Sequence, residues 1–432
     1  MRIAIIGGGI AGLTAAYELG KAGHETVVYE RDPELGGQAG TFPVGGTRLE
    51  RFYHHIFTSD RHIIELLGEL GLASQLQWIP SRVGWFYGGR VYNFVTPMDL
   101  LRFSPLNLVD RVRAGVVSLY LQRKAEGLQY ENTTAASWIK RYAGPNVYRV
   151  LWNPLLRGKF GQQAEEVSMT WFWGKMHLRF GSRKGLGKES LGYLTGSFQV
   201  LVDALARRVV AQGGSIRTHS PVERVLVDNG RATGVRAGQG DEQADRVIAT
   251  VPSFTFLGMV PEFPGDYADL LRKVSYQAAL VLVLQISQSV SPKYWLNISD
   301  PNIPFVAAIE HTNYIPPETY GGKRLLYLSN YLSADSALFR ASKDEVIAAY
   351  TPGVQRINPA FDASWIEDSW LFRDPAGQPV VTRGYSQIIP AYRTPISGLY
   401  LANTTQIYPE DRGMNYSVRL GQTIATVVQD AG

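Results

Sequence analysis

The 432-residue chain contains no cysteine. This excludes disulfide bonds, thiolate metal sites, a redox-active cysteine pair, a cysteine nucleophile and a flavin tethered through sulfur. The sequence also lacks any run of about 18 uncharged apolar residues, so no segment is expected to span a membrane. The first residues carry no apolar stretch of the kind found in secretion signals. These absences favour a cytoplasmic location.

Dense tracts of one charge sign are missing as well. The net charge of +5 and the isoelectric point near 9.1 describe a mildly basic surface. Without a lysine- or arginine-rich tract, no nucleic-acid partner is expected. Attraction to an anionic ligand or to acidic lipid headgroups remains open. The seven histidines are scattered along the chain, and we expect no metal site.

The length of the chain predicts two domains. The pattern of apolar residues predicts a strand at 2–6, a helix at 10–22 and a second strand at 25–29, which is a βαβ beginning. Similar alternation of helix and strand returns in a helix at 197–212, strands at 215–218, 222–227, 232–235, 246–251 and 398–402, and a closing helix at 417–428. We therefore expect a discontinuous nucleotide domain at 1–75, 190–265 and 385–432, and a substrate domain at 76–189 and 266–384.

A glycine motif stands between the first strand and the first helix, at Gly7, Gly9 and Gly12. Gly7 permits a tight turn, Gly9 lets the backbone approach a pyrophosphate, and Gly12 allows close packing of helix and strand. The start of the helix offers N–H groups to phosphate. Glu30 ends the second strand, where a carboxylate accepts hydrogen bonds from ribose hydroxyls and repels the 2′-phosphate of NADP. These features predict a dinucleotide site.

The segment that follows, Glu30 to Thr41, resembles the second signature of the flavin amine oxidase superfamily. In that group a glycine pair follows the ribose-binding acid, and Gly36 and Gly37 match it. The group usually has Arg next, and this chain has Gln38. The resemblance implies that the dinucleotide is FAD.

Two further stretches extend this resemblance. Residues 196–225 are similar to a segment in which a valine at the start of a strand contacts adenine through its backbone, and Val222 matches that valine. Residues 398–402 are similar to the last strand of the family, which normally continues with Gly-Asp; here Asn403 and Thr404 follow. The closing helix of the family points its N-terminus at the flavin pyrimidine ring, and 413–416 holds that place.

The resemblance implies a fold class and a cofactor site. The fold is α/β, with a Rossmann-like FAD-binding domain (a parallel sheet with a β-meander) and an inserted α+β substrate domain. The residues expected at the FAD are Gly7, Gly9, Ile10, Ala11, Gly12, Glu30, Arg31, Gly36, Gly37, Gln38, Val222, Asn403, Thr404, Met414 and Asn415.

Catalytic signatures are expected to be thin, because the flavin takes the hydride and the protein orients substrate and moves at most one proton. The first candidates are His54 and His55, at the point where the superfamily runs past the flavin ring; the alternative is that they are packed or exposed structural residues. His55, Ile56 and Phe57 also resemble a segment of UDP-galactopyranose mutase. A further candidate is His311, although a plain loop is the alternative there.

Two other clusters leave alternatives open. Trp171, Phe172, Trp173, His177 and Arg179 either line a substrate pocket or form an aromatic core. Residues 106–124 place apolar and basic side chains at helical spacing. This segment is either an amphipathic helix packed on its own domain or a helix that makes peripheral contact with a membrane.

The sequence therefore predicts an FAD-dependent oxidoreductase of the amine oxidase, protoporphyrinogen oxidase and phytoene desaturase group. It would remove hydride and proton from a C–N or C–C bond of a small-molecule substrate. A non-redox flavin mutase acting on a nucleotide sugar and a flavin-binding protein without catalysis are the alternatives.

Overall fold

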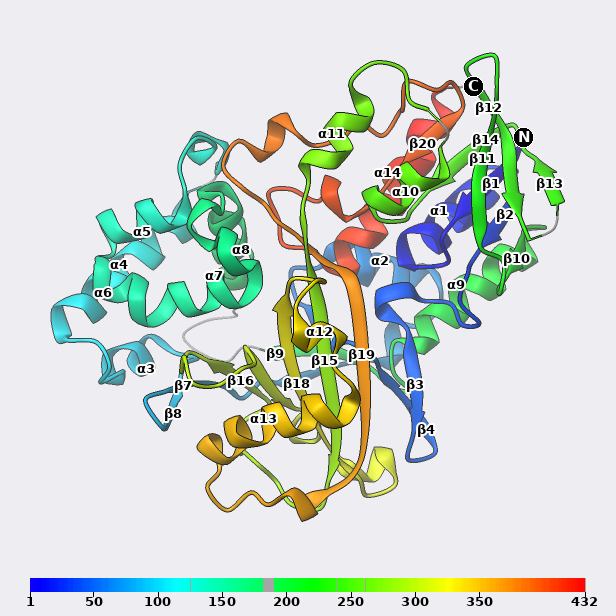
Figure 1. Cartoon of the computed structure of the whole chain (residues 1–432). Helices are drawn as coiled ribbons and strands as arrows, with labels where there is room; N and C mark the ends of the chain where they lie inside the picture. The colour runs from blue at the N-terminus through cyan, green and yellow to red at the C-terminus, as the bar shows by residue number, and fades with distance from the viewer. Residues whose placement is uncertain (125, 182–189, 239, 261, 432) are drawn as a thin grey trace.

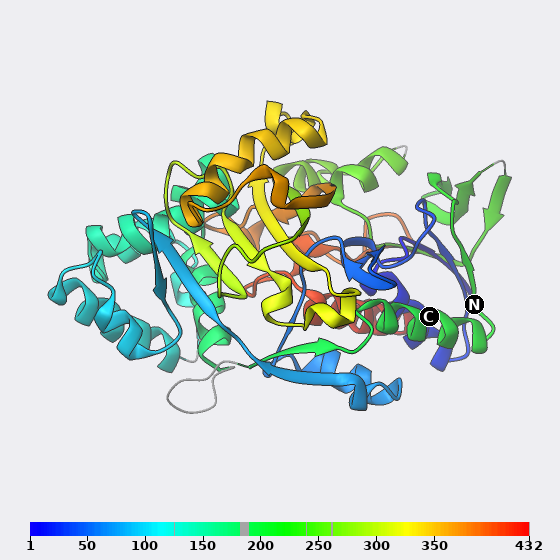
Figure 2. The same ribbon diagram turned by 90° about the horizontal axis from the view of Figure 1, so that it is seen from below.

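The computed structural model describes residues 1–124, 126–181, 190–238, 240–260 and 262–431, with only the backbone at 178–181. A parallel sheet lies at one end of the molecule and a group of helices at the other, with a large mixed sheet between them (Figure 1 and Figure 2). Both termini lie beside the parallel sheet, far from the helical end.

The parallel sheet has five strands in the order β10-β2-β1-β14-β20. Because it is parallel, the carboxyl ends of all five strands lie at one edge, where ligands bind in folds of this type. Gly7 follows β1 at this edge and Glu30 follows β2. The strands are β1 (Arg2–Ile6), β2 (Glu25–Tyr29), β10 (Ser215–Arg217), β14 (Arg246–Ala249) and β20 (Leu399–Leu401), and all five were predicted to within about two residues.

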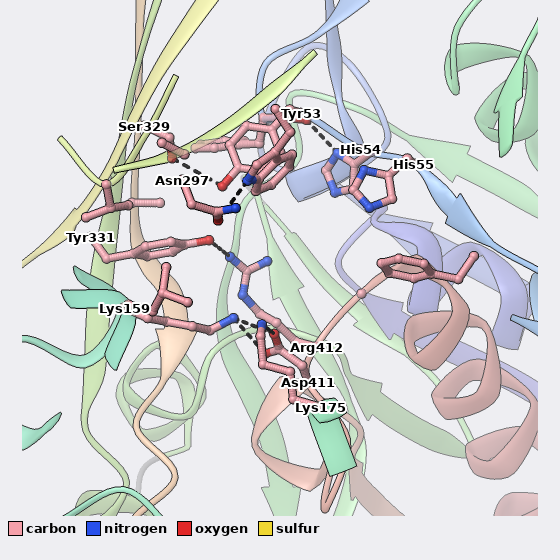
Figure 3. A pocket seen from close by; sticks show the side chains of 18 of the residues that line it. Tyr53, His54, His55, Lys159, Lys175, Asn297, Ser329, Tyr331, Asp411 and Arg412 are labelled. Atoms are coloured by element: carbon pink, nitrogen blue, oxygen red, sulfur yellow. Dashed lines mark hydrogen bonds and ion pairs between the residues drawn. The ribbon is translucent and has the colours of Figure 1, made fainter. Parts of the chain in front are cut away.

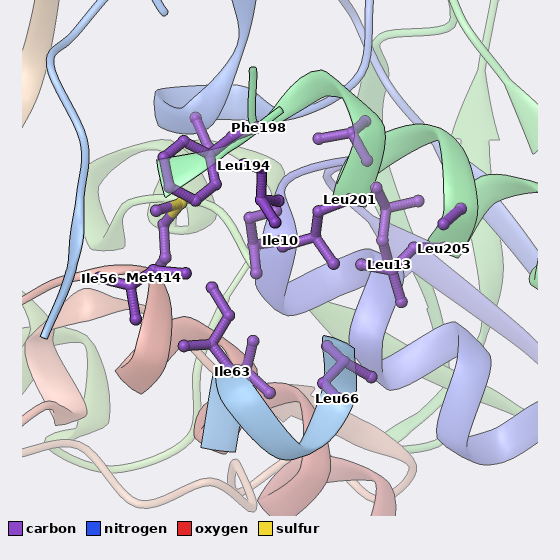
Figure 4. Packing of buried hydrophobic residues seen from close by; sticks show 14 of the residues in the cluster. Ile10, Leu13, Ile56, Ile63, Leu66, Leu194, Phe198, Leu201, Leu205 and Met414 are labelled. Atoms are coloured by element: carbon purple, nitrogen blue, oxygen red, sulfur yellow. The ribbon is translucent and has the colours of Figure 1, made fainter. Parts of the chain in front are cut away.

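Three helices cover one face of this sheet, namely α1 (Ile10–Lys21), α9 (Gln199–Ala211) and α14 (Met414–Gln429), and α2 (Arg61–Glu69) packs against α14. Apolar side chains fill the space between them, among them Leu13, Leu66 and Leu201, which are fully buried (Figure 4). Each such side chain contributes about 1.5–3 kcal/mol by leaving water. A Cβ on Gly421 would lie 2.6 Å from the carbonyl oxygen of Ala11, so the lack of a side chain lets α14 cross α1 closely.

A β-meander of β11 (Val222–Asp228), β12 (Arg231–Ala237) and β13 (Gly240–Gln243) packs on the other face of the parallel sheet, together with α10 (Ser253–Met259) and α11 (Tyr267–Lys273). The predicted α/β class, with a parallel sheet and a meander, is confirmed. The third meander strand, β13, has the polar sequence GDEQ and was not predicted, because it has no apolar alternation.

The second sheet has seven strands in the order β19-β15-β18-β17-β16-β7-β8. The strand β15, which lies between β19 and β18, alternates between two environments: Leu280 and Leu282 face α13 (Lys343–Ile357), and Val281 and Val283 face the core shared with the nucleotide domain. The seven strands are β7 (Val83–Tyr87), β8 (Arg90–Asn93), β15 (Tyr276–Ile286), β16 (Trp295–Ile298), β17 (Ala307–Glu310), β18 (Arg324–Leu332) and β19 (Ile366–Pro379).

Smaller elements connect the two sheets. A hairpin consists of β3 (Thr41–Val44) and β4 (Thr47–Glu50). A three-stranded sheet joins β5 (Ile56–Phe57), β6 (Leu76–Pro80) and β9 (Ser190–Leu194), which come from both sides of the expected domain boundaries near 75 and 190. The short helix α12 (Ala337–Arg340) precedes α13. The domain boundaries themselves stay a prediction.

The helical end contains α3 (Pro97–Arg102), α4 (Leu108–Arg123), α5 (Ala135–Tyr142), α6 (Pro145–Val147), α7 (Asn153–Phe160) and α8 (Met169–Gly181). The helix α4 does not pack by the face that its apolar pattern indicates. It buries Asp110, Ala114 and Leu121 and leaves most of its large apolar residues exposed, namely Leu108, Val109, Val112, Val116, Leu119 and Tyr120. The helix therefore packs on its own domain, against α8, but through Ala114 and Leu121 and not through these exposed apolar side chains. Peripheral membrane contact stays a prediction.

None of the helices in the described residues is both long enough and apolar enough to cross a membrane.

Candidate active site

The loop after β1 meets the loop after β2 at the carboxyl edge of the parallel sheet. The carboxylate of Glu30 accepts the backbone N–H groups of Gly8 at 2.7 Å and Asp32 at 2.9 Å. The N–H of Gly36 donates to the carbonyl of Gly8 at 2.9 Å. Each carboxylate oxygen of Glu30 therefore has one protein donor and retains a lone pair for a ribose hydroxyl.

Gly9 provides the test of whether this edge fits a dinucleotide. Its φ of −76° is open to any residue. A Cβ at this position would have no protein atom of another segment closer than 3.9 Å. Neither backbone strain nor protein packing therefore requires glycine here. A pyrophosphate lying against the backbone at the start of α1 does require it, and the residues present fit the cofactor.

The other glycines have structural reasons for lacking a side chain. Gly7 has φ of +110°, which favours glycine. A Cβ on Gly12 would lie 2.0 Å from the carbonyl oxygen of Gly7. Gly36 and Gly37 also have positive φ, and Gly37 packs its backbone against Gly9.

Several other residues were also expected at the cofactor. Val222 begins β11 close to Glu30, because the N–H of Ser220 donates to the Glu30 carbonyl. The side chain of Asn403 is instead occupied within the protein, by Thr405, the carbonyl of Val251 and Ser253. Two others lie near solvent: Arg31 is exposed beside Asp32, and Thr404 is half-buried. Their roles at the cofactor stay predictions.

Gln38, which stands where the family usually has Arg, lies against β19. Its amide nitrogen donates to the carboxylate of Asp374 at 2.7 Å and to the carbonyl of Ala376 at 3.1 Å. Its amide oxygen accepts from Arg412 at 3.4 Å. The guanidinium of Arg412 thus lies beside Gln38, the position at which the family usually has an arginine.

The start of α14 forms a second N-terminus facing the site. Gly413 caps the helix without a side-chain hydrogen bond, and Met414 and Asn415 begin its first turn. The amide oxygen of Asn415 accepts the N–H of Ile63 at 3.1 Å, which fixes α2 against α14. The helix dipole favours negative charge at this point.

A cavity of about 320 Å³ opens at the start of α14 (Figure 3). Its wall is drawn from separated parts of the chain, namely residues 52–60, Val83, residues 152–175, Leu191, residues 279–331 and residues 411–416. Most of the wall is aromatic or aliphatic, and its ionisable side chains form two groups that lie apart in Figure 3. One end carries His54, His55 and Asp60, and the other carries Lys159 and Arg412.

His54 is held in one tautomer. Its Nδ1 lies 2.5 Å from the carbonyl oxygen of Phe52, which can only accept, so Nδ1 carries the proton and Nε2 is an acceptor. Burial lowers the pKa of His54 to about 4. At neutral pH the residue is therefore an uncharged imidazole on the cavity wall, with no protein partner for Nε2 among the described residues.

His55 and Asp60 flank His54. The ring of His55 packs edge-on against Phe57, with centroids 4.9 Å apart, and against Trp295. The carboxylate of Asp60 accepts the N–H of Phe57 at 2.8 Å, and burial raises its pKa to about 6. The structure thus brings both predicted histidines to one cavity, together with a carboxylate that was not predicted.

Three charged residues from two helices and the segment before α14 meet at the other end of the cavity. The ammonium of Lys159 on α7 lies 2.7 and 2.6 Å from the two carboxylate oxygens of Asp411, and that of Lys175 on α8 lies 2.9 Å from one of them. Burial alone would raise the pKa of Asp411, but the two ammonium groups hold it well below its usual range. Burial lowers the pKa of Lys159, against the attraction of Asp411.

Arg412 stands beside this group and points into the cavity (Figure 3). It donates to Gln378 Oε1 at 3.1 Å, to Tyr331 Oη at 3.0 Å and to Gln38 Oε1 at 3.4 Å. All three acceptors are neutral. Among the described residues, no carboxylate lies within ion-pair distance of its guanidinium.

His311 lies outside this cavity wall. It is buried, its Nε2 lies 2.6 Å from Tyr320 Oη, and burial lowers its pKa to about 3. Tyr320 contacts Tyr193 at 3.3 Å, and Tyr193 donates to the buried carboxylate of Glu50 at 2.8 Å. The geometry therefore places His311 in an internal hydrogen-bonded chain, and its catalytic role stays an untested prediction.

The sequence left two alternatives for the aromatic cluster at 171–179, a pocket lining or an aromatic core, and each applies to some of its residues. Trp171 and Phe172 line the cavity, whereas Trp173 is buried and stacks on His177 with centroids 5.0 Å apart. The side chain of Arg179 lies outside the described residues. Lys159, Asp411 and Arg412 were missed, because isolated charged residues in three distant segments carry no sequence signal for their meeting.

Comparison with known sequences identifies a family. The sequence model described as flavin containing amine oxidoreductase matches residues 10–428. A relative of known sequence, the flavin-dependent L-tryptophan oxidase RebO of Lentzea aerocolonigenes, is 24% identical over 422 residues, which cover 85% of this chain and 85% of that protein.

Comparison with solved structures shows the same fold. A crystal structure of reduced UDP-galactopyranose mutase matches with a TM-score of 0.78 and 17% identity, covering 100% of this chain and 96% of that one. Wild-type putrescine oxidase bound to putrescine matches with a TM-score of 0.74 and 16% identity, covering 100% and 99%. At these identities the likeness concerns the fold alone.

Proposed function

This chain belongs to the family of flavin containing amine oxidoreductases, and from that premise we propose that it removes a hydride and a proton from a C–N or C–C bond of an organic substrate. It is an FAD-dependent oxidoreductase. The observation that carries the proposal is the neutral imidazole of His54 in the wall of a largely apolar cavity at the start of α14.

The residues at the edge of the parallel sheet would hold FAD along its length. Glu30 would accept the ribose hydroxyls, and the backbone at Gly9 and the start of α1 would bind the pyrophosphate. The start of α14 at Met414 would face the flavin pyrimidine ring. When bound, FAD supplies the hydride acceptor that the oxidation requires.

The chain itself contributes a candidate base, His54, and an aromatic cavity wall. Nε2 of His54 can accept a hydrogen bond or a proton from the substrate, because Nδ1 is committed to the Phe52 carbonyl. The aromatic wall, which includes Trp171 and Phe172, excludes water and orients an apolar part of the substrate.

Anaerobic reduction of the purified holoprotein tests this proposal. Amines, amino acids, polyenes and porphyrinogens would be added in turn, and loss of visible flavin absorbance would be recorded for each. We expect one class to reduce the flavin, and readmission of oxygen or a quinone to restore the absorbance with consumption of one acceptor per product.

The second candidate function is a flavin mutase acting on a nucleotide sugar. Two observations favour it: the similarity of His55, Ile56 and Phe57 to a segment of that enzyme, and the shared fold. A mutase works with reduced flavin and consumes no acceptor. Rearrangement of a nucleotide sugar after dithionite reduction, with no acceptor consumed and no oxidisable substrate found, would contradict the oxidoreductase proposal.

A further inference from the structure

Arg412 is the cation of the charged end of the cavity that meets only neutral acceptors among the described residues. The neighbouring ammonium of Lys159 is paired with the carboxylate of Asp411. Asp60 lies at the other end of the wall, beside Phe57. Asp374 lies behind Gln38, outside the wall, and its carboxylate accepts from Gln38 and from the N–H of Ala376.

Arg412 has donors to spare. A guanidinium has five N–H groups, and the three hydrogen bonds to Gln378, Gln38 and Tyr331 use one on each nitrogen. Among the described residues, one N–H on each terminal nitrogen therefore has no partner. Two such donors on one planar group match the two oxygens of a carboxylate or phosphate.

The apolar part of the wall indicates that the ligand also has an apolar part. Trp152, Leu155 and Phe172 are among the apolar side chains that line the cavity. A polyene would leave Arg412 without a counter-ion, and a protonated amine beside Arg412 would be repelled by it. An acid with an apolar body satisfies both parts of the wall.

We propose that the substrate is an organic anion whose carboxylate or phosphate group binds between Lys159 and Arg412, with its apolar body along the aromatic wall toward His54. The assignment rests on the proposed function, because it presumes that the cavity holds the substrate. It places the oxidised bond at the His54 end, away from the anionic group.

Binding of a matched pair of probes tests the proposal. The holoprotein would be titrated with 3-phenylpropionate and with 3-phenylpropylamine, which share an aromatic body and differ in charge. The readout is the perturbation of the flavin absorbance spectrum, supported by calorimetry. We expect saturable binding of the carboxylate and at least about tenfold weaker binding of the amine. Equal or tighter binding of the amine would overturn the proposal.

Variants locate the binding group. Arg412→Gln and Lys159→Gln should each weaken 3-phenylpropionate by about ten- to a hundredfold, the factor expected for one charge-assisted hydrogen bond. Arg412→Lys keeps the charge without the planar fork and should fall between. The control is Arg340→Gln on α12, an exposed arginine paired with Asp335, which should leave binding unchanged.

FAD content separates failure of this proposal from failure of the proposed function. If Arg412→Gln and Arg412→Lys keep FAD and bind the carboxylate as tightly as the native protein, the anion site is wrong although the oxidoreductase proposal stands. If both instead lose FAD while the Arg340 control keeps it, Arg412 serves the cofactor and the anion site is again overturned. A native protein that binds no FAD contradicts the proposed function itself.

A second inference comes from the surface of the helical end. Large apolar side chains are exposed together on α3 and α4, with Val109 73% exposed, Leu108 65% and Val116 61%. Residues 98–124 also contain five basic and two acidic side chains, and Arg102, Arg113 and Arg123 are exposed around the apolar face. Apolar area rimmed by positive charge matches the surface of a bilayer with acidic headgroups.

We infer that the α3–α4 surface docks on an anionic lipid membrane. Co-sedimentation with phosphatidylcholine vesicles, with and without phosphatidylglycerol, tests this at low and high salt. We expect binding that requires the anionic lipid and weakens with salt. The double variant Val112→Ser, Val116→Ser should bind about tenfold more weakly, whereas Val210→Ser, an exposed valine on α9, should bind as the native protein does.

Two outcomes would overturn the membrane inference. One is equal sedimentation of the native protein and the double variant. The other is a change of oligomeric state in the double variant, measured by light scattering without vesicles, which would assign the surface to a second copy of this chain.

Discussion

The tautomer of His54 follows from one hydrogen bond, and its charge state follows from its burial. The Phe52 carbonyl fixes the proton on Nδ1, and burial keeps the ring uncharged at neutral pH. The sequence indicated the position of this residue but not its tautomer or its pKa, because both depend on the fold around it. The same holds for Asp60, whose carboxyl looks like an ordinary helix-capping residue in the sequence and lies in the cavity wall.

Replacement of His54 by alanine should lower turnover by about tenfold or more, since a positioned base contributes at least this much. FAD content and the melting temperature should stay close to native. His24→Ala is the matched control, because His24 precedes β2 at the opposite end of the strand from Glu30. With the pKa of His54 lowered to about 4, its loss should remove no step near pH 6.5 from the pH profile of kcat/KM. Full activity of both variants would make His54 structural.

Glu50 is a buried carboxyl with a consequence for stability. Burial raises its pKa from 4.5 to about 7, against hydrogen bonds from the Phe198 N–H and Tyr193. The folded protein therefore binds this proton more tightly than the unfolded chain. The stability contributed by the protonated carboxyl is fully present below pH 4.5 and is lost as the pH rises to about 7.

Glu50→Gln should remove this loss, because the amide keeps an acceptor and never ionises. Relative to the native protein, the free energy of unfolding of the variant should rise by roughly 2–3 kcal/mol between pH 4.5 and pH 8. Denaturant unfolding across this range measures it. Stability curves that run parallel at all pH values would contradict the assignment.

At the scale of elements, prediction worked where local pattern and packing agree. The strands and helices of the nucleotide domain have short connections and regular apolar spacing, so β1, α1 and β2 were located from sequence almost to the residue. The helix α4 was located too, but the direction of its apolar face was not, because periodicity shows that a face exists and not what covers it. β13 was missed because it is polar on both faces.

The glycine loop makes an element-scale prediction from two matched substitutions. Gly9→Ala places a methyl group where no protein atom lies closer than 3.9 Å, so the apoprotein should keep its native melting temperature while FAD affinity falls by about tenfold or more. Gly12→Ala places a methyl group 2.0 Å from the Gly7 carbonyl oxygen and should destabilise the apoprotein by about 1–3 kcal/mol. Calorimetry of both apoproteins and FAD titration separate the effects. Unchanged FAD affinity in Gly9→Ala would remove the pyrophosphate from this position.

At the scale of the whole molecule, the cavity is assembled by the packing of distant segments. His54 follows the hairpin β3–β4, Lys159 ends α7, and Arg412 precedes α14. The glycine motif could be recognised from sequence because it is contiguous, and the charged group of the cavity could not because its residues are isolated in the chain. The order of the segments in the nucleotide domain nevertheless sufficed to indicate the family, which the match over residues 10–428 confirms.

The cofactor released by the purified protein is the measurement that tests the central claim most directly. The account predicts a yellow protein with the absorbance spectrum of an oxidised flavin, which releases FAD and not FMN on denaturation, in about one equivalent per chain. FAD is expected because Glu30 and the glycine loop would bind the adenosine half and the pyrophosphate. A colourless protein that cannot be reconstituted with FAD, or one that releases FMN, would contradict the account.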